Sequence, residues 1–393
     1  MASPCVSGRR WSRIVKMTLF LCFLIPMAAT GIGNTNTIVG QKQKIDIQRQ
    51  LKHLNKPALK SIKSPDGDII DCVHIKNQPA FDYRFFKNHT IQMRPSFHPE
   101  GLSFDNVSSK SESLITQLWH LNGRCPKGTI PIRRTKEEDL LRASSVASYG
   151  REKHPQFDTT NKGGFHEHAL TVVTGDKYYG TKATINSWKP QIQEQDEFSL
   201  SKLLILGGVA PKDLNTIEAG WMKDANQTMG CYNLLCSPGF VQINKEIALG
   251  GSLNPLSVYA GSQYELNFLV WKDIKGRGDW WMQVGNKYLM GYWPASLFVS
   301  LSESASQIQW GGEVINQQKN GQHTSTQMGS GHFPEEGFSR ASYFKNLQIV
   351  DGSNILRFPK KSFIVTEKPN CYNVTNFVNY FYYGGPGRNP NCP

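Results

Sequence analysis

The strongest constraint on the fold is the series of short apolar segments that fills the chain from residue 164 onward. These segments are rich in β-branched and aromatic residues and are separated by Gly, Pro, Asn or Asp, which is typical of strands. They cover residues 169–175, 178–188, 198–208, 215–221, 239–244, 264–273, 280–293, 306–315 and 342–351. Many short strands at near-regular spacing favour a sandwich or barrel built from two packed antiparallel sheets. The sequence therefore predicts an all-β domain over residues 164–393.

The residues before this domain differ in character. Residues 34–56 are polar with scattered Ile and Leu, which suits at best a short amphipathic helix. Residues 60–132 contain short apolar runs broken by Pro, Gly and Asn, which predicts a small β-rich unit. Residues 133–163 are charged and include the dibasic pair Arg133-Arg134, a composition typical of an exposed linker that proteases cut.

The amino terminus has the layout of a secretory signal peptide. Basic residues between Arg9 and Lys16 precede the apolar run 17–29, and small residues follow at 28–31. We therefore predict a signal peptide over residues 1–31 and a secreted protein. A membrane anchor, the alternative, needs about 20 apolar residues, so no membrane attachment is expected once the signal peptide is removed.

Removal of this leader leaves six of the eight cysteines, an even number that suits disulfides in an oxidising compartment. Six cysteines allow fifteen connectivities, and we predict the nearest-neighbour one while the others stay open. Its pairs are Cys72 with Cys125, Cys231 with Cys236, and Cys371 with Cys392. Four acceptor sequences for N-glycosylation agree with secretion; they begin at Asn88, Asn106, Asn226 and Asn373.

The formal charge of +13 raises the question of nucleic-acid binding. Residues 1–159 hold 24 Lys and Arg against 13 Asp and Glu, whereas residues 160–393 hold 20 against 18. The excess therefore belongs to the leader and the first segment, and the chain has neither a helical arginine stripe nor an RNA-binding signature. We expect no nucleic-acid partner.

Most common catalytic signatures are absent from the sequence: it has no Gly-x-Ser-x-Gly elbow, no His-Glu-x-x-His motif and no P-loop. His166 and His168 would point to the same face of a strand, but a zinc site needs a third protein ligand. His323 or His332 would have to supply it. A surface or packing role is the commoner explanation for such a pair, so we expect no metal and no other cofactor.

Two acids occur inside apolar, strand-like runs. Glu218 lies in Asn-Thr-Ile-Glu-Ala-Gly-Trp and Glu313 in Ile-Gln-Trp-Gly-Gly-Glu-Val. A carboxylate inside a strand is costly unless it is paired or hydrogen-bonded. Each glutamate is therefore either a salt-bridge partner or a functional residue, and for one such acid taken alone the salt bridge is the simpler explanation.

A series of ordered motifs separates these alternatives. They are Tyr-Tyr-Gly at 178–180, Ile-Glu-Ala-Gly-Trp at 217–221, Gly-Cys-Tyr-Asn-Leu-Leu-Cys at 230–236, Gly-Asp-Trp-Trp at 278–281, Gly-Tyr-Trp-Pro at 291–294, Trp-Gly-Gly-Glu-Val at 310–314 and Met-Gly-Ser-Gly-His-Phe at 328–333. Residues 165–359, which contain them, resemble the plant neprosin family of glutamic peptidases. Residues 45–132 resemble the activation peptide of that family.

The resemblance implies an antiparallel β-sandwich with a catalytic cleft on one face and a pro-segment that blocks this cleft as an intramolecular inhibitor. It also implies that Glu218 and Glu313 are the catalytic pair and that Cys231–Cys236 and Cys371–Cys392 are disulfides. The expected domains are a signal peptide (1–31), an activation pro-segment (32–132), an exposed linker (133–163) and the catalytic domain (164–393). We expect a monomer outside the cell, in the apoplast or cell wall, that cleaves peptides or proteins and prefers those containing proline.

Two carboxyl groups that share a site repel each other when both are ionised, so one pKa rises and the pair holds one proton. The ionised member can then activate water while the protonated one donates to the peptide group. The sequence therefore predicts a secreted glutamic endopeptidase, made as a zymogen and active at acid pH.

The chain departs from the family in one place. Only residues 222–229 connect Trp221 to Gly230, where the family usually has a longer stretch rich in aromatic residues and Arg. The alternative is therefore a catalytically impaired cell-wall or carbohydrate-binding protein on the same sandwich, its aromatic rings stacking on sugars. A glycosidase that uses the two acids is a third hypothesis, and it requires their carboxyl groups to be about 5–5.5 or 6.5–9.5 Å apart.

Overall fold

The computed structural model of the chain describes residues 35–86, 88–101, 116–142, 164–210, 212–224, 234, 239–375, 377 and 379–393. The predicted signal peptide, the acceptor residues Asn106 and Asn226, and the pair Cys231 and Cys236 lie outside these residues. The chain forms two compact units, Met1–Lys44 and Ile45–Pro393.

The pro-segment contains a small antiparallel sheet in the order β1-β2-β3, in agreement with the β-rich unit expected from the sequence. Its strands are β1 (Ala58–Lys63), β2 (Ile69–His74) and β3 (Thr129–Arg133). The helix α1 (Thr35–Leu54) has 20 residues and is longer than the short helix expected. The remaining helical segments of this part are η1 (Ile75–Asn77), η2 (Pro79–Asp82), η3 (Arg84–Phe86), η4 (Leu118–Asn122) and α2 (Glu137–Arg142).

The start of the predicted linker belongs to this folded part, so the expectation that it is exposed from residue 133 was wrong. Arg133 is buried and pairs with Asp68 at 2.9 Å and with Asp139 at 3.3 Å. Arg134 binds Asp71 with its Nε at 2.7 Å. A guanidinium group satisfies a buried carboxylate through several hydrogen bonds at once, which explains why a dibasic pair sits inside the fold. Residues 143–163 lie outside the described part.

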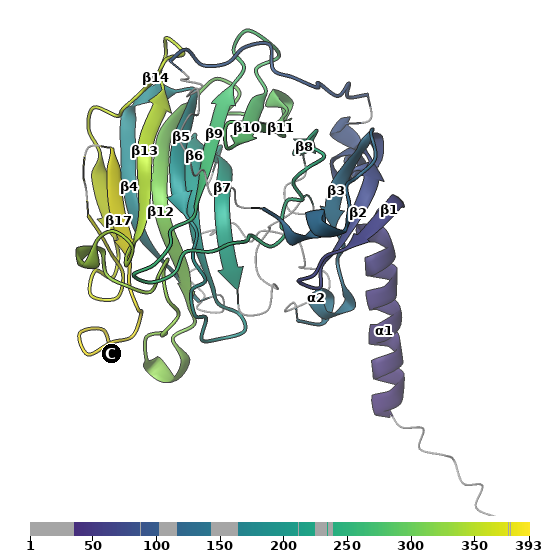
Figure 1. Cartoon of the computed structure of the whole chain (residues 1–393), viewed down its shortest axis with the longest axis horizontal. Coiled ribbons are helices and arrows are strands. Elements are labelled where there is room, and N and C mark those ends of the chain that lie inside the picture. Colours follow the sequence, from purple (N-terminus) through teal and green to yellow (C-terminus); the bar gives the residue numbers. More distant parts are fainter. Residues whose placement is uncertain are drawn as a thin grey trace, which may run out of the picture. The chain divides into compact units, whose positions relative to one another are not determined.

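The second part is a sandwich of two antiparallel sheets, which confirms the predicted fold class (Figure 1). The five-stranded sheet has the order β15 (Phe363–Thr366), β4 (Phe165–Tyr178), β12 (Ala305–Asn316), β6 (Phe198–Gly207) and β7 (Asn215–Asp224). The nine-stranded sheet has the order β16 (Asn373–Val374), β17 (Tyr380–Gly384), β13 (Ser342–Val350), β5 (Gly180–Asn186), β9 (Glu265–Lys272), β10 (Trp280–Val284), β11 (Tyr288–Trp293) and β8 (Val241–Gln242), with β14 (Leu356–Arg357) beside β13. Short helical turns η5 (Ala295–Leu297), η6 (Lys319–Gly321) and η7 (Pro334–Glu336) lie in the connections.

The core lies between the two sheets and follows from the alternation of side chains along each strand. Trp310 of β12 is fully buried, and its indole donates to the Thr181 hydroxyl of β5 at 3.0 Å. The neighbouring residues Trp280 and Trp281 of β10 are both fully buried but belong to two different apolar clusters. Trp280 points into the core, whereas Trp281 points to the outer face of the nine-stranded sheet.

This outer face carries an apolar patch, formed by Val241, Leu269, Trp271, Trp281 and Tyr292, which we call the docking face. Ala80 and Phe86 of the pro-segment complete its apolar cluster. The fully buried side chain of Gln78 accepts a hydrogen bond from the Gln242 backbone at 2.8 Å and donates to its carbonyl at 3.1 Å. The pro-segment therefore packs on the nine-stranded sheet, and its burial there is mainly hydrophobic.

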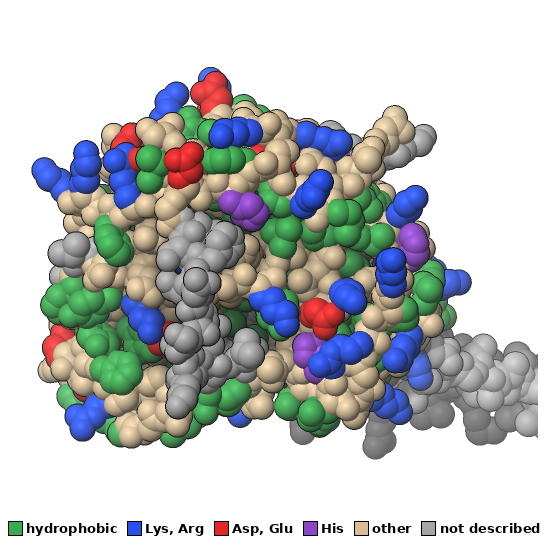
Figure 2. Space-filling model, turned by 45° about the horizontal axis from the view of Figure 1, so that its top comes forward, with side chains coloured by type: hydrophobic (Ala, Val, Ile, Leu, Met, Phe, Trp, Pro, Cys, Tyr) green, Lys and Arg blue, Asp and Glu red, His purple; other side chains and the backbone are tan. Residues whose placement is uncertain are grey.

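Disulfides join Cys72 to Cys125 and Cys371 to Cys392, the pairs expected for these four cysteines. Among the described helices, none is long and apolar enough to cross a membrane. On the face of the molecule shown in Figure 2, the described Lys and Arg side chains are scattered among other groups and do not form one basic patch.

Candidate active site

The outer face of the five-stranded sheet gathers a group of charged side chains. Antiparallel pairing places Glu313 of β12 opposite His168 of β4, and Lys202 of β6 opposite Gly311 of β12 and Gly220 of β7. Trp310 and Val314, which flank this stretch of β12, point into the core, so Glu313 points outward. The group, which we call the charged face, comprises His166, His168, Lys202, Glu218, Glu313 and Glu367.

Glu313 is the most enclosed member of this group, with a side chain that is 6% exposed. His166 Nδ1 lies 2.5 Å from its Oε1, and Lys202 Nζ lies 2.7 Å from its Oε2. His168 Nε2 lies 3.6 Å from the same Oε2. A buried carboxylate needs such partners because removal from water without them is strongly unfavourable.

Lys202 connects the two glutamates that the sequence singled out. Its Nζ lies 2.7 Å from Glu313 Oε2 and 3.1 Å from Glu218 Oε1, so these two oxygens are no more than 5.8 Å apart. The Glu218 side chain is 33% exposed, in contrast to that of Glu313. The structure therefore brings both predicted residues together, with an ammonium group between their carboxylates.

Two glycines permit this arrangement. A Cβ at Gly220 would lie 1.9 Å from the Ser201 carbonyl oxygen, and one at Gly311 would lie 2.1 Å from the Ala169 carbonyl oxygen. Any larger residue would force the strands apart. Gly220 thus allows β7 to approach β6, the strand of Lys202, and Gly311 allows β12 to approach β4, the strand of the two histidines.

The ionisation of the site follows from these contacts. Burial acts to raise the pKa of Glu313, but Lys202 and the hydrogen bonds from His166 and His168 outweigh it and hold that pKa well below its ordinary value. Burial likewise acts to lower the pKa of Lys202, but Glu313 and Glu218 raise it above its ordinary value. Glu313 is therefore an anion and Lys202 a cation at both neutral and mildly acid pH.

His168 links the site to a further acid, Glu367, which follows β15. The His168 backbone N–H donates to Glu367 Oε2 at 2.6 Å, and its Nδ1 lies 3.1 Å from Oε1. Burial acts to lower the pKa of His168, but hydrogen bonds to Glu313 and Glu367 raise it to about 9. His168 is accordingly held as a cation by two carboxylates.

Sequence analysis missed Lys202 and Glu367. Lys202 interrupts the apolar run Phe-Ser-Leu-Ser-Lys-Leu-Leu-Ile-Leu, and a lysine within a strand of that kind indicates a buried partner. Nothing comparable marks Glu367, which lies at the end of a short strand. The expectation that His166 and His168 share one face of a strand is confirmed, because both contact Glu313.

Comparison with known families identifies the chain. Residues 61–172 match the family model described as Neprosin activation peptide, and residues 221–386 match the model described as Neprosin. Together these matches span more than half of the 393 residues. The chain belongs to the neprosin family. It is therefore a glutamic peptidase, a hydrolase that carries its own activation peptide and is made as a zymogen.

Part of the candidate active site lies outside both matched ranges. Glu313 lies within the Neprosin match, whereas Lys202 and Glu218 lie between the two matched ranges. The domain boundaries at residues 31 and 163 stay predictions. The crystal structure of Scytalido-glutamic peptidase with a peptide based transition state analog is similar to this chain at a TM-score of 0.31 and 8% identity, over 57% of this chain and 98% of that one. We draw nothing further from a likeness of this size.

The described contacts of the pro-segment, up to residue 132, fall on the docking face and near the β8–β11 edge, not on the charged face. His89 Nε2 lies 2.7 Å from the Tyr292 hydroxyl, the Gln92 amide donates to Asp279 at 2.6 Å, and Trp271 donates to the Phe97 carbonyl at 2.9 Å. The expectation that the pro-segment blocks the catalytic cleft stays a prediction.

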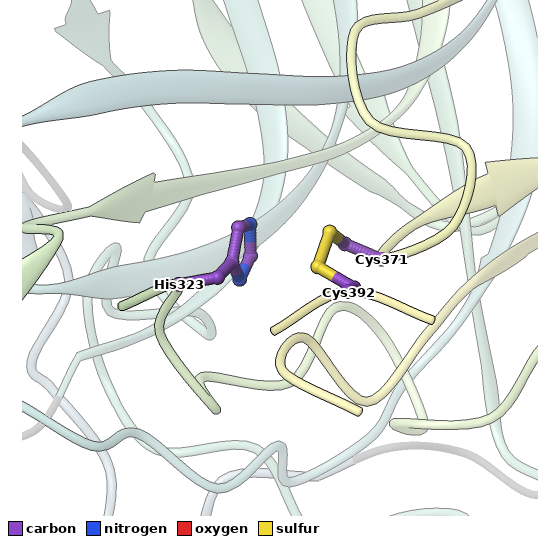
Figure 3. A group of neighbouring side chains, drawn as sticks. All are labelled: His323, Cys371 and Cys392. Carbon is purple, nitrogen blue, oxygen red and sulfur yellow. A yellow bond between two sulfur atoms is a disulfide. The ribbon is translucent and has the colours of Figure 1, made fainter. Parts of the chain in front are cut away.

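A second group of neprosin-domain residues has the composition of a metal site (Figure 3). His323, Cys371 and Cys392 place one potential ligand atom each within 4.8 Å of one another. The cysteines form a disulfide, and both ring nitrogens of His323 lie 2.7 Å from acceptors, Glu167 Oε2 and the Thr324 carbonyl. A thiolate, not a disulfide sulfur, is the form of cysteine that binds metals, and both nitrogens of His323 are engaged, so this group does not fit a metal. His323 also lies away from His166 and His168, because Glu167 points to the opposite face of β4.

The short connection after Trp221 lies largely outside the described residues, since β7 ends at Asp224 and residues 225–233 are not described. Asn88 is exposed, whereas Asn373 is half-buried and its amide donates to Glu335 at 3.3 Å. Glycosylation at the four acceptor residues stays a prediction.

Proposed function

We propose that this neprosin-family chain is a secreted endopeptidase that hydrolyses peptide bonds at acid pH through Glu218 and Glu313. The observation that carries the proposal is the meeting of these two carboxylates on the charged face, where β7 and β12 contribute one each and Lys202 contacts both. Two acids at this distance, one buried and one partly exposed, differ enough in environment to hold different protonation states.

The chemistry uses one ionised and one protonated glutamate. The ionised carboxylate accepts a proton from a water molecule as the water oxygen bonds to the peptide carbonyl carbon. The protonated carboxyl donates its proton toward the carbonyl oxygen, and a proton then passes to the amide nitrogen as the C–N bond breaks. The products are a free carboxyl group and a free amine, and because water is the nucleophile no covalent bond to the enzyme forms.

This division of roles supports an acid pH range. A carboxyl group serves as a proton donor only while it is protonated, and glutamic acid side chains are ordinarily protonated below about pH 4.3. The other carboxylate must stay ionised in the same range, which the contacts around Glu313 favour. Activity is therefore expected to fall when both groups are ionised.

Secretion is supported by the leader 1–31 and by the two disulfides, which persist in oxidising compartments. The preference for proline-containing peptides rests on the sequence resemblance alone. We therefore include it in the proposal as a substrate class to be tested.

The test is peptide hydrolysis by the mature enzyme across acid pH, with wild type compared to Glu313→Gln. The substrates are matched peptides with and without proline, plus an aryl glycoside, since carboxyl groups about 5–5.5 Å apart also suit a retaining glycosidase. We expect peptide cleavage that Glu313→Gln reduces by about 10²- to 10⁴-fold. Cleavage of the glycoside, or full peptide turnover by the variant, would overturn the proposal.

One observation favours carbohydrate binding as a second function. A hollow of about 250 Å³ on the outer face of β13 and β17 is lined by Phe338, Tyr343, Lys345, Asn346, Asn379, Tyr380 and Tyr382. Exposed aromatic rings beside amide groups suit sugars, which stack on rings and hydrogen-bond at their edges. Retention on an insoluble polysaccharide that is lost in Tyr380→Ala would support this function, and no retention of wild type would dismiss it.

A further inference from the structure

The charged face contains a group that two-glutamate chemistry does not require. Lys202 lies in a strand of otherwise apolar and small residues, and its side chain is only 11% exposed. Burial of an ammonium group is costly unless it is fully paired. Here its Nζ contacts one oxygen of each glutamate, at 2.7 and 3.1 Å, so the position of Lys202 depends on both carboxylates and their positions depend on it.

We infer that Lys202 is a positioning residue of the peptidase site that holds Glu218 and Glu313 together and fixes their roles, with Glu313 as the base and Glu218 as the acid. This inference rests on the proposed function, because it assigns the two roles of that reaction. The sequence predicts two carboxyl groups that are held together by one shared proton. In the structure the Lys202 ammonium group lies between them instead.

The charges around Glu313 support this assignment. From β4 it faces His166 and His168, from β6 it faces Lys202, and Glu218 of β7 lies beyond the Lys202 ammonium. Glu367 lies behind His168. Without Lys202, Glu218 and Glu313 would face each other with less positive charge between them, and like charges at this distance raise a carboxyl pKa.

The two glutamates are unequal in their contacts. Glu313 is 6% exposed and has Lys202, His166 and His168 as partners, so its protonation would weaken three contacts at once, with Lys202 left to Glu218 and His168 left to Glu367. Glu218 is 33% exposed and pairs with Lys202, which keeps Glu313 as a partner when Glu218 is protonated. Loss of the charge of Glu313 would therefore disturb more contacts than loss of the charge of Glu218, which makes Glu313 the base and leaves Glu218 as the acid.

The experiment measures the pH dependence of kcat/KM for mature wild type, Lys202→Met and Lys202→Arg. Removal of a nearby opposite charge raises a carboxylate pKa by about 1–3 units. In Lys202→Met we expect the acid limb of the profile, where Glu313 becomes protonated, to move to higher pH by that amount. In Lys202→Arg the acid limb should stay at the pH of wild type, with a lower kcat. Lys319→Met is the matched control, because Lys319 pairs with Glu194 in connections outside the charged face; its profile should equal that of wild type.

A lysine that only stabilises the fold would lower the yield of active enzyme and leave the limb in place, which would overturn the inference. The proposed function would still stand if wild type cleaves peptide and Glu313→Gln does not. If wild type cleaves no peptide, the proposed function fails. The effect of Lys202 on the protonation of Glu313 is then measured by a titration that needs no enzymatic activity.

The measurement without turnover is a ¹³C NMR titration of glutamate carboxyl groups in the precursor, with the Glu313 signal identified by its loss in Glu313→Gln. We expect its midpoint to rise by about 1–3 pH units in Lys202→Met. Should that variant fail to fold, Glu218→Gln replaces it, because Lys202 would then serve Glu313 alone and the Glu313 midpoint should fall. A midpoint that moves in neither variant would refute the role of Lys202.

Discussion

The two sheets of the sandwich present opposite chemistry on their outer faces. The charged face of the five-stranded sheet carries three carboxylates, two histidines and a buried lysine, whereas the docking face of the nine-stranded sheet carries Trp271, Trp281 and Tyr292 under the pro-segment. Both faces arise from the same alternation of side chains along a strand. The difference implies that reaction chemistry and attachment of the activation peptide depend on separate residues and can be altered separately.

The largest effect that we expect from a single substitution is a loss of precursor stability at the docking face. Trp281 is fully buried, and truncation of such a residue to alanine costs about 3–5 kcal/mol. Trp281→Ala should reduce the free energy of unfolding of the precursor by that amount in a denaturant titration, without changing turnover per folded molecule. Phe338→Ala is the matched control, because Phe338 is 64% exposed. A comparable loss of stability in Phe338→Ala would mean that the docking face does not stabilise the precursor more than an exposed ring does.

Three histidines make the attachment of the activation peptide sensitive to pH: His89 and His98 on the docking face, and His120 beside Glu246 after β8. Burial lowers the pKa of His89, His98 and His120, against the charges of Asp279, Asp273 and Glu246 respectively. The docked state therefore binds fewer protons than the free peptide. Its stability is fully present above the ordinary histidine pKa of about 6.5 and is lost as the pH falls through the lower, docked values.

Acid release of the activation peptide is thus the next expected effect. After cleavage in the connection 143–163, size-exclusion chromatography should show the peptide bound at neutral pH and free at acid pH. His98 stacks 5.0 Å from Trp271 and its buried Nδ1 has no hydrogen-bond partner among the described residues, so His98→Phe should fit and lower the release pH by about half a unit. The exposed His53 provides the control His53→Phe, and equal shifts in both variants would contradict the assignment to the docking face.

The smallest expected effect is that of metal removal. His323 and its neighbouring disulfide have no ligand atom to offer, and His166 and His168 are engaged with Glu313 and Glu367. EDTA should therefore change neither peptide turnover nor the unfolding midpoint. Strong inhibition that zinc reverses would place a metal on the charged face and remove the two-glutamate mechanism.

Sequence patterns predicted the sandwich because its strands alternate cleanly and end at Gly, Pro or Asn. Glu218 and Glu313 were also found from sequence, since acids in apolar strands require a partner. Lys202 and Glu367 were not found, because their role depends on strand order. β6 lies between β12 and β7, and only that neighbourhood places the ammonium group between two glutamates that are 95 residues apart in the chain.

The pro-segment shows a second limit of prediction from sequence. The charge and scarcity of large apolar residues in 133–163 predicted an exposed linker, yet Arg133 is buried because Asp68, far away in the sequence, supplies its partner. Composition cannot distinguish a solvated arginine from one that is paired inside a fold. The sequence likewise gave no means to decide which sheet the activation peptide contacts.

The most direct test of the account is a paired measurement on Glu218→Gln, of peptide turnover at acid pH and of the free energy of unfolding. Glu218 is one-third exposed and its ion pair with Lys202 is partly solvated, so the substitution should change stability by no more than about 1 kcal/mol. Turnover should fall by about 10²- to 10⁴-fold, the usual effect of losing a general acid. Full turnover in a stably folded Glu218→Gln protein would contradict the assignment of the charged face as the active site.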